Sequence, residues 1–515
     1  MSGGLIQSID YAALAVPLIL AVVAGLVLLL DAFLPDRPGG GRLLGLVTLG
    51  GVAASLAVVA LQAAGGGERR TFCVPDAPAG PGPQACSYVA DRFTLVFAAV
   101  VLAAGLVVVL LSMAELADGR IPAGEWYFLL LATLAGATLL PASRDLIMLV
   151  VSLELASLPV FALTAMRRYD GRATEAALKL FLVSVVSTAV MLFGVSLLYG
   201  VTGSVHLDRV AGALASASAG SGAAAPELAT SGVVPVAVVL VLAGFAFKVA
   251  AVPFHSWAGD VYQGAPIPVA ALLSVVSKAA GFAGLILILT SALPGQAGVW
   301  APVVAVIAAL TMTAGNVLAL RQRDAVRLLA WSSVAQSGYV LAPLAAFAGV
   351  RHRAPADVAG VARASIAYLV FYAAMNLVAF CVVMLVSRRR ERNEMDDYRG
   401  LALRSPAAGL ALAFSLVCLA GLPPGLAGLF AKVVVFREVI QGGLGWLAVV
   451  MAVNTVIGLY YYIAWTARLF TPEPAGGGLP RPAPAAVPVV VAVAFAVVVT
   501  VAFSVAPQLV LSAAG

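Results

Sequence analysis

The chain has 515 residues, of which 62% are hydrophobic and only 10% are charged. A water-soluble protein of this length needs far more polar surface, so the composition excludes a soluble globular protein and predicts an all-α, polytopic membrane protein. The formal net charge of +6 reflects arginines that lie mainly in predicted loops and at helix ends, so it indicates membrane orientation rather than nucleic-acid binding.

Apolar stretches of roughly 20 residues, the length that crosses a bilayer, recur along the whole chain. They predict about fourteen transmembrane helices, the last of which follows a linker rich in proline and glycine at 471–486. The stretches lie near 11–33, 41–63, 91–114, 124–142, 143–166, 173–200, 231–257, 265–290, 296–319, 327–349, 360–387, 405–440, 444–468 and 485–512.

The arginines predict how these helices are oriented. If the N-terminus is outside, 17 of the 26 arginines fall on the inner side and nine on the outer side. Inner loops carry an excess of basic residues, so this count predicts that both termini lie outside. The inner set is Arg37, Arg42, Arg120, Arg167, Arg168, Arg172, Arg321, Arg323, Arg327, Arg388, Arg389, Arg390, Arg392, Arg399, Arg404, Arg468 and Arg481.

The cysteines offer no redox motif. Cys73 and Cys86 lie in the predicted outer loop 64–90, where a disulfide between them and two free thiols are both possible. Cys381 and Cys418 fall inside predicted helices. Since the chain has no CxxC pair, haem or iron–sulfur spacing, GxGxxG motif or P-loop, we expect it to bind no cofactor or metal itself.

The lysines are distributed differently from the arginines. The chain has four of them, and all four fall inside predicted membrane helices: Lys179, Lys248, Lys278 and Lys432. Arginine stays protonated, whereas a desolvated lysine can release its proton, so buried lysines predict proton sites. Glu154 is the only carboxylate at the middle of a predicted helix.

These buried groups need an explanation, because each ionisable group at the bilayer centre costs about 2.5–3.5 kcal/mol even on the lenient insertion scale. The alternative to a functional role is a purely structural ion pair. For Lys179 this alternative is strongest, because Glu175 lies four residues before it and its side chain could extend to the inner surface.

Prolines interrupt two of the predicted helices. Pro253 breaks helix 7, and Pro423 and Pro424 break helix 12, each beside a lysine. Proline removes a backbone donor, and discontinuous helices at corresponding places in two halves mark ion paths in transporters. The breaks are five helices apart, an odd number of crossings, so they predict two inverted repeats, helices 4–8 and 9–13. An ordinary proline kink is the alternative for either break alone.

The predicted repeats divide the chain into four parts. Residues 1–123 hold helices 1–3, 124–292 hold the first repeat, 293–470 hold the second repeat, and 471–515 hold the linker and helix 14.

Three stretches then become recognisable. FKVAAVPFHSWAGDVYQGAPIPVAALLSVVSKAAGF (247–282), RQRDAVRLLAWSSVAQSGYVL (321–341) and LELASLPVFAL (153–163) resemble stretches of the antiporter-like, proton-pumping subunits of respiratory complex I. The resemblance covers about 125–470. Within this family the chain is most similar to subunit N, because Lys432 stands where another antiporter-like subunit usually has glutamate.

The resemblance implies a role for each buried charge. Glu154 resembles the fifth-helix glutamate that pairs with a seventh-helix lysine, here Lys248. Lys278 resembles the central lysine of helix 8, Lys432 the residue on helix 12, and Lys179 a lysine on helix 6. The implied function is proton translocation as a membrane subunit of a bacterial NADH-quinone oxidoreductase, driven by quinone reduction elsewhere.

The same resemblance implies partners and location. FMN, iron–sulfur clusters and quinone are then expected in other subunits, and the partners are the other membrane subunits of the complex and the lipid bilayer of the bacterial cell membrane. Two other readings stay open, a subunit of a multi-subunit Na⁺/H⁺ antiporter and a passive assembly subunit with inert ion pairs.

The chain departs from the family pattern at two positions. Gln336 stands where the family often has a histidine, and Gly259 replaces a proline. Glutamine cannot titrate, so a proton relay there must use water or neighbouring groups. His255 remains after the first break, where it could pass protons or close the end of the broken helix.

Overall fold

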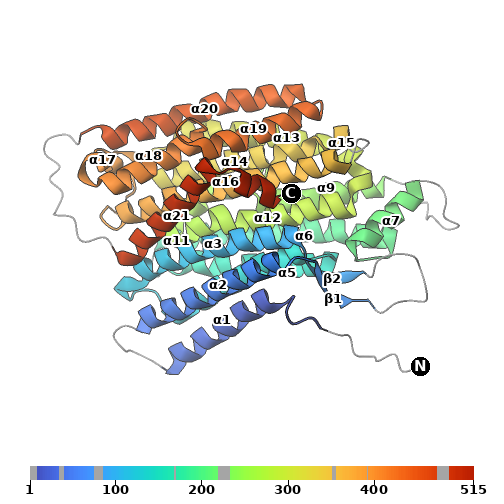
Figure 1. Cartoon of the computed structure of the whole chain (residues 1–515), viewed down its shortest axis with the longest axis horizontal. Helices are drawn as coiled ribbons and strands as arrows, with labels where there is room; N and C mark the ends of the chain where they lie inside the picture. The colour runs from blue at the N-terminus through green and yellow to red at the C-terminus, as the bar shows by residue number, and fades with distance from the viewer. Residues whose placement is uncertain are drawn as a thin grey trace.

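The computed structural model describes residues 9–33, 40–74, 85–167, 170–218, 232–350, 355–390, 392–472 and 486–514. In this part of the chain the fold is a bundle of helices lying side by side, with a two-stranded hairpin beside the start of the chain (Figure 1). The helices of the first half are α1 (Ala15–Phe33), α2 (Gly40–Gly65), α3 (Arg92–Glu115), α4 (Ala123–Leu139), α5 (Leu146–Ala165), α6 (Gly171–Thr202), α7 (Leu207–Ser218), α9 (Val233–Lys248), α10 (Trp257–Gly264), α11 (Ile267–Leu272) and α12 (Lys278–Leu287).

The helices of the second half are α13 (Ala297–Leu320), α14 (Ala325–Ala345), α15 (Phe347–Val350), α16 (Pro355–Ser387), α17 (Leu401–Arg404), α18 (Pro406–Ala420), α19 (Leu426–Gln441), α20 (Gly445–Phe470), α21 (Val487–Val505) and α22 (Gln508–Ala514). The strands are β1 (Arg69–Cys73) and β2 (Cys86–Ala90), and π-helical turns at Leu273–Ser277 and Ile288–Ala292 flank α12.

Twelve helices in the described ranges are long and apolar enough to cross a membrane. Two shorter apolar helices, α9 and α18, are each followed by a break and a second helix. The first break contains Pro253 and the second contains Pro423 and Pro424, so both predicted interruptions are present. The all-α, multi-pass fold class is confirmed. If each broken helix crosses the membrane as one unit, the count equals the predicted fourteen, and that count stays a prediction.

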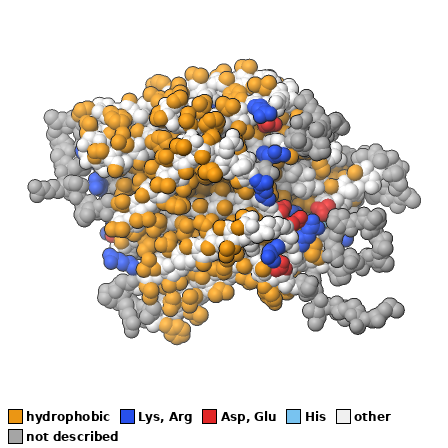
Figure 2. Space-filling view, viewed as in Figure 1, with side chains coloured by type: hydrophobic (Ala, Val, Ile, Leu, Met, Phe, Trp, Pro, Cys, Tyr) orange, Lys and Arg blue, Asp and Glu red, His pale blue; other side chains and the backbone are white. Residues whose placement is uncertain are grey.

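Apart from the few charges inside the bundle that are described below, the charged side chains of the described residues lie mainly toward the two ends of the bundle, because charge is costly at membrane depth. Figure 2 shows hydrophobic side chains over the middle of one face and most of the visible Lys, Arg, Asp and Glu side chains toward its two ends. At the end opposite the hairpin, Arg167 pairs with Glu115 at 2.6 Å, and Arg390 pairs with Asp397 at 3.1 Å. Which end faces the cell interior stays a prediction. Five arginines of the sequence-based count lie outside the described residues: Arg37, Arg168, Arg351, Arg353 and Arg481.

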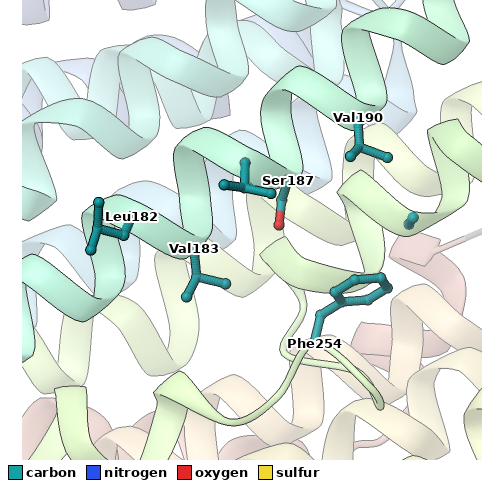
Figure 3. A pocket seen from close by; sticks show the side chains of 7 residues that line it. Leu182, Val183, Ser187, Val190 and Phe254 are labelled. Atoms are coloured by element: carbon teal, nitrogen blue, oxygen red, sulfur yellow. The ribbon is translucent and has the colours of Figure 1, made fainter.

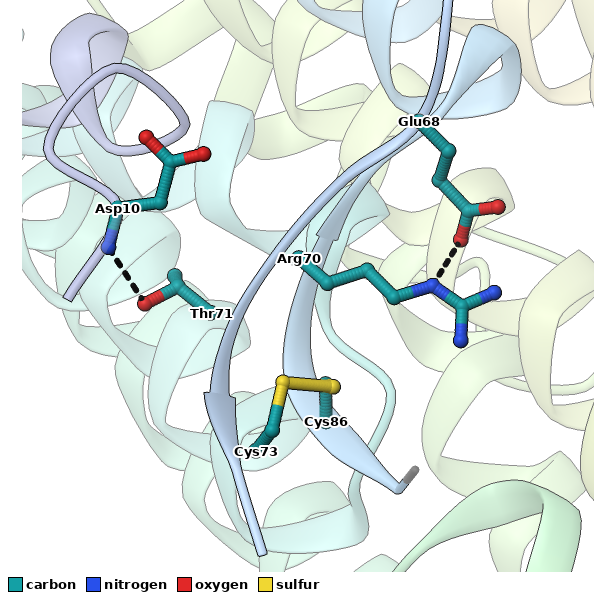
Figure 4. Close-up of a disulfide and its surroundings, with 6 residues drawn as sticks. All are labelled: Asp10, Glu68, Arg70, Thr71, Cys73 and Cys86. Atoms are coloured by element: carbon teal, nitrogen blue, oxygen red, sulfur yellow. Dashed lines mark hydrogen bonds and ion pairs between the residues drawn. A yellow bond between two sulfur atoms is a disulfide. The ribbon is translucent and has the colours of Figure 1, made fainter. Parts of the chain in front are cut away.

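At the opposite end of the bundle, the hairpin formed by β1 and β2 is bonded to the segment that precedes α1. Cys73 and Cys86 face each other across β1 and β2 and form a disulfide (Figure 4). Asp10 donates its backbone N–H to Thr71 on β1, and the Tyr88 hydroxyl donates to the carbonyl of Ala13. Of the two states left open by the sequence, the structure has the disulfide. Cys381 and Cys418 are free and buried, as expected.

Cysteine labelling tests both this disulfide and the predicted orientation. In intact cells, a membrane-impermeant maleimide is expected to label Cys73 and Cys86 only after reduction with an impermeant phosphine. A double Cys73→Ser, Cys86→Ser variant leaves only the buried Cys381 and Cys418, so it should stay unlabelled. Labelling without reductant would refute the disulfide, and labelling only after cell lysis would place the hairpin inside.

The residues that precede α5 and α14 make matching contacts in the two predicted repeats. The Asp145 side chain caps α5, and its backbone forms a bridge with His206. The Asp324 side chain caps α14, and its backbone forms a bridge with Glu394. In each case the carboxylate accepts the N–H three residues later. Burial raises the pKa of Asp324, against the hydrogen bonds from the Arg327 N–H and Gln263 that favour its charged form.

Close glycine contacts repeat at the same spacing. A Cβ added to Gly136 on α4 would overlap the backbone of Ala156 on α5, and one added to Gly315 on α13 would overlap the backbone of Ala335 on α14. Gly315 follows Gly136 by 179 residues. The same interval separates Ala335 from Ala156 and Asp324 from Asp145. Both helix pairs therefore need glycine at the same place, which supports the predicted repeats. The exact bounds of the repeats and the four-part division stay predictions.

Candidate functional site

The first buried charge centre joins α5, α6 and α9. Lys248 is the last residue of α9, and its Nζ lies 3.3 Å from Oε1 of Glu154 on α5. The same Nζ donates to Ser157 at 2.9 Å and to Ser184 at 3.2 Å. The Thr188 hydroxyl donates to the Glu154 carboxylate at 2.8 Å. The Lys248 side chain is only 6% exposed, so three oxygens compensate the loss of water around its ammonium group.

The broken backbone after Lys248 is satisfied by neighbouring helices. The carbonyl of Val249 accepts a hydrogen bond from Lys278 at 3.5 Å, and the N–H of Val252 donates to Thr311 on α13 at 2.9 Å. Backbone groups at membrane depth need such partners, because no bulk water reaches them. The break in helix 7 thus provides a backbone carbonyl, one residue after Lys248, to which Lys278 donates a hydrogen bond.

The second centre is Lys278, the first residue of α12. Its Nζ donates to the carbonyl of Ser333 and to the hydroxyl of Ser337, both at 2.6 Å and both on α14. The Ser333 hydroxyl is 2.6 Å from the hydroxyl of Tyr372 on α16. In the described ranges no carboxylate lies within 4.0 Å of the Lys278 ammonium. Unlike Lys248, this lysine is held entirely by neutral oxygens.

A row of side chains continues from this centre along α14. Gln336 donates to the Tyr462 hydroxyl at 3.3 Å and accepts from the Tyr368 hydroxyl at 2.5 Å. The Tyr368 ring is stacked on Tyr339, with ring centroids 5.7 Å apart. These aromatic residues are all at least 98% buried. Gln336, where the family often has histidine, therefore sits among hydroxyl groups rather than beside a charge.

The third centre is Lys432 on α19. Its Nζ donates to the carbonyl of Ala420 at 2.7 Å and lies 5.7 Å from the centroid of the Tyr339 ring. Ala420 is the last residue of α18, so the ammonium group meets the negative end of that helix. At each break, then, a carbonyl freed by the interruption is bonded by a buried lysine, Lys278 at the first and Lys432 at the second.

Lys179 is not brought to this row. Its Nζ pairs with Asp260 on α10 at 2.8 Å and with Glu175 at 2.6 Å, and its side chain is 43% exposed. Arg327 on α14 pairs with the other oxygen of Asp260 at 2.9 Å. Asp260, which the sequence did not single out, therefore ties α10 to both α6 and α14. The structure places Lys179 in this exposed network, and a part in proton transfer stays a prediction.

His255 lies between α9 and α10 and is half-buried. Its carbonyl accepts the N–H of Ala258 at 3.1 Å, which begins the turn that leads into α10. Its ring centroid is 5.9 Å from that of Trp331, and its Nδ1 has no partner among the described residues. The backbone of His255 thus helps to start the second half of the broken helix, while proton transfer through the ring stays a prediction.

Comparisons with known proteins identify the family. A family model described as the NADH:quinone oxidoreductase/Mrp antiporter transmembrane region matches residues 143–458. NADH-quinone oxidoreductase subunit N 2 of Streptomyces griseus is 54% identical over 477 residues, which are 91% of this chain and 84% of that protein. This chain belongs to the NADH-quinone oxidoreductase subunit N family. Subunit N of Salinispora tropica is 45% identical over 92% of this chain and 87% of its own.

Solved structures agree with membership of the subunit N family. A chain of respiratory complex I from Thermus thermophilus is 30% identical, with a TM-score of 0.72 over 96% of this chain and 98% of its own. A chain of the Mrp complex from Dietzia has a TM-score of 0.80 over 98% of this chain and 96% of its own, but only 22% identity. The second likeness shows a shared fold alone. The identities therefore favour subunit N over the antiporter alternative.

A small cavity lies beside the first centre of this subunit N family member. Its volume is about 20 Å³, and its lining includes Lys248, Ser157, Ser184, Ser277 and Trp257. A cavity needs roughly 10–15 Å³ of this measure to hold one water. The space between Lys248 and the residue that precedes Lys278 is therefore large enough for a single water molecule.

A wider cavity of about 290 Å³ lies at the exposed side of α6, and its lining differs from that of the small cavity. Figure 3 shows Phe254 from the break beside α6, which contributes Leu182, Val183, Ser187 and Val190. Its lining is almost entirely apolar and contains no ionisable side chain. This cavity is therefore not part of the polar region around Lys248, Lys278 and Lys432.

Sequence reasoning missed most of the neutral partners in the row. Ser157 could have been found, because it follows Glu154 by three residues and so lies on the same helix face. Ser184, Ser337 and Tyr339 carry no such signal, because each becomes relevant only when a distant helix packs beside it.

Proposed function

We propose that this subunit of NADH-quinone oxidoreductase translocates protons through the row formed by Glu154, Lys248, Lys278 and Lys432. The observation that carries the proposal is that each lysine is buried and bonded to oxygens supplied by other helices. Such costly groups in a membrane interior are functional far more often than structural.

The proposed transfer begins at the ion pair. While Glu154 is charged and close, it stabilises the ammonium form of Lys248. When the pair opens, Lys248 loses that stabilisation and releases its proton toward Lys278, through a water in the small cavity. The backbone and hydroxyl oxygens beside Lys278 keep both lysines within one polar region.

The proposed path continues along α14, which packs against α10, α16 and α19. From Lys278 the proton passes Ser337 and the hydroxyl groups around Gln336 to reach Lys432 beside Tyr339. Gln336 cannot carry the proton as an ion, so it orients the tyrosine hydroxyls and water that do.

We further propose where this subunit acts. The driving energy comes from quinone reduction in partner subunits, which would hold the FMN, the iron–sulfur clusters and the quinone. The other membrane subunits of the complex are the proposed partners, in a bacterial cell membrane with both termini outside. The similarity to a chain of complex I supports an assembly of this kind.

One test of this function replaces the Glu154 carboxylate with a neutral side chain of the same shape. In assembled complex reconstituted into liposomes, Glu154→Gln is expected to lower both proton uptake and coupled quinone reduction at least fivefold, because Lys248 then lacks its switching partner. Proton uptake is followed by a pH-sensitive dye and turnover by NADH absorbance. Unchanged values for both would contradict the proposal, and a loss that appears only in sodium buffers would favour the antiporter alternative.

A further inference from the structure

A hydroxyl group from another helix accepts a backbone N–H at each of the two helix breaks. At the first break, the N–H of Val252 donates to the Thr311 hydroxyl on α13 at 2.9 Å. At the second break, the N–H of Ala427 donates to the Ser504 hydroxyl on α21 at 3.2 Å. Where one helix ends and another begins, N–H groups lack the acceptor that a continuous helix supplies. Because an unpaired N–H inside a membrane protein is unfavourable, these two hydroxyls stabilise the breaks.

Both hydroxyls are held in the same way by their own helices. The Thr311 hydroxyl donates to the carbonyl of Ile307 at 2.6 Å, and the Ser504 hydroxyl donates to the carbonyl of Thr500 at 2.9 Å. In each case the carbonyl belongs to the residue four positions earlier on the helix. A hydroxyl has only one proton to donate, so each oxygen meets the break as an acceptor.

The two helices that supply these hydroxyls hold corresponding places in the predicted order. The helix α13 is the ninth predicted helix and comes directly after the first repeat, helices 4–8. The helix α21 is the fourteenth and comes directly after the second repeat, helices 9–13. Since α13 packs against α9 and α21 packs against α19, each contacts one half of the broken helix in the repeat before it. The helix α21 thus serves the second break as α13 serves the first.

Each of these bonds lies close to a group that holds a buried lysine. Val252 follows Val249 by three residues, and the carbonyl of Val249 accepts a hydrogen bond from Lys278. Ala427 and Lys432 lie on the same helix, α19, and Lys432 bonds back to the helix before the break. A shift of the backbone at either break would therefore move a lysine or one of its partners.

We propose that Thr311 and Ser504 are positioning residues that fix the two helix breaks, and with them Lys432 and the carbonyl partner of Lys278. Without the hydroxyl, each N–H must find water or another acceptor, and the backbone beside it shifts. The place of the breaks does not depend on proton transfer, whereas any effect on proton uptake rests on the proposed function. Neither side chain titrates, so both act by holding the backbone and not by carrying a proton.

Cys418 lies beside the second of these bonds and can report on it. It is a free, buried cysteine on α18, and its side chain interacts with the Ser504 hydroxyl. With Cys381 replaced by serine and the Cys73–Cys86 disulfide intact, Cys418 is the one free thiol that this subunit offers to a membrane-permeant maleimide.

In the assembled complex, labelling of Cys418 is expected to be about threefold faster or more in Ser504→Ala than in Ser504→Thr, because the N–H of Ala427 then draws water to the break. Labelling is followed by mass spectrometry of this subunit. Equal rates in the two variants would overturn the inference.

Proton uptake tests the consequence at both breaks. At equal amounts of assembled complex, Ser504→Ala and Thr311→Val are expected to lower uptake about threefold or more, whereas Ser504→Thr and Thr311→Ser keep the hydroxyl and retain uptake. Thr500→Val is the matched control, because the Thr500 hydroxyl donates to the carbonyl of Ala496 on its own helix. Equal losses in the variants that keep the hydroxyl would assign the effect to packing and overturn the inference.

The two measurements keep this inference apart from the proposed function. Faster labelling of Cys418 with normal proton uptake would support the hydroxyl bond and contradict the proposed proton path. If Ser504→Ala does not assemble, Thr311→Val against Thr311→Ser makes the comparison at the first break, and equal uptake by that pair would overturn the inference.

Discussion

Replacing Lys248 with methionine is expected to reduce proton translocation and coupled quinone reduction by the assembled complex at least tenfold. Methionine fills a similar volume but has no proton to exchange, and it leaves the half-buried Glu154 carboxylate without its cation. An unpaired charge in such a place is strongly unfavourable, so Glu154 would take up a proton or draw in water. Either change removes the first step of the proposed transfer.

Lys248→Arg separates charge from proton exchange. Arginine can keep the ion pair with Glu154, but it stays protonated under all ordinary conditions. We therefore expect Lys248→Arg to assemble and still lose most of its proton uptake, measured with the same dye in liposomes. If Lys248→Arg pumps as the natural protein does, Lys248 would act only as a fixed charge, and the path would need another proton carrier.

Gly428→Ala is expected to have the largest effect on stability. A Cβ at this position on α19 would overlap the carbonyl oxygen of Cys418 on α18, so the two halves of the broken helix would have to move apart. The overlapped atoms belong to the backbone of Cys418 rather than to a flexible side chain. Overpacking of this kind costs about 3 kcal/mol at the upper end of its usual range. Because Lys432 lies one turn further along α19, its bond to Ala420 would also be disturbed.

The expected result is a marked loss of assembled complex, measured on native gels and by the temperature of thermal unfolding. Gly50→Ala is the matched control, because it lies on α2 and an added Cβ meets nothing within 4 Å. Alanine also favours a helix over glycine by about 1 kcal/mol, so this control should be neutral or slightly stabilising. Equal amounts of complex from the two variants would contradict this prediction, because they would show that α18 and α19 can move apart at the second break without loss of the complex.

The sequence by itself determined the features that depend on local chemistry. Hydropathy over windows of about 20 residues predicted the membrane fold, since the bilayer sets that length. Pro253, Pro423 and Pro424 located both helix breaks, because proline interrupts a helix wherever it stands. The confinement of lysine to apolar stretches pointed to Lys248, Lys278 and Lys432, and all three are buried.

Only the tertiary structure decided how those residues are connected. Each helix can rotate about its axis without any change in its hydropathy, so the sequence could not tell which side chains face one another. The two closest partners of Lys278 lie more than 50 residues away on α14, and Lys179 turns outward to meet Asp260 on α10.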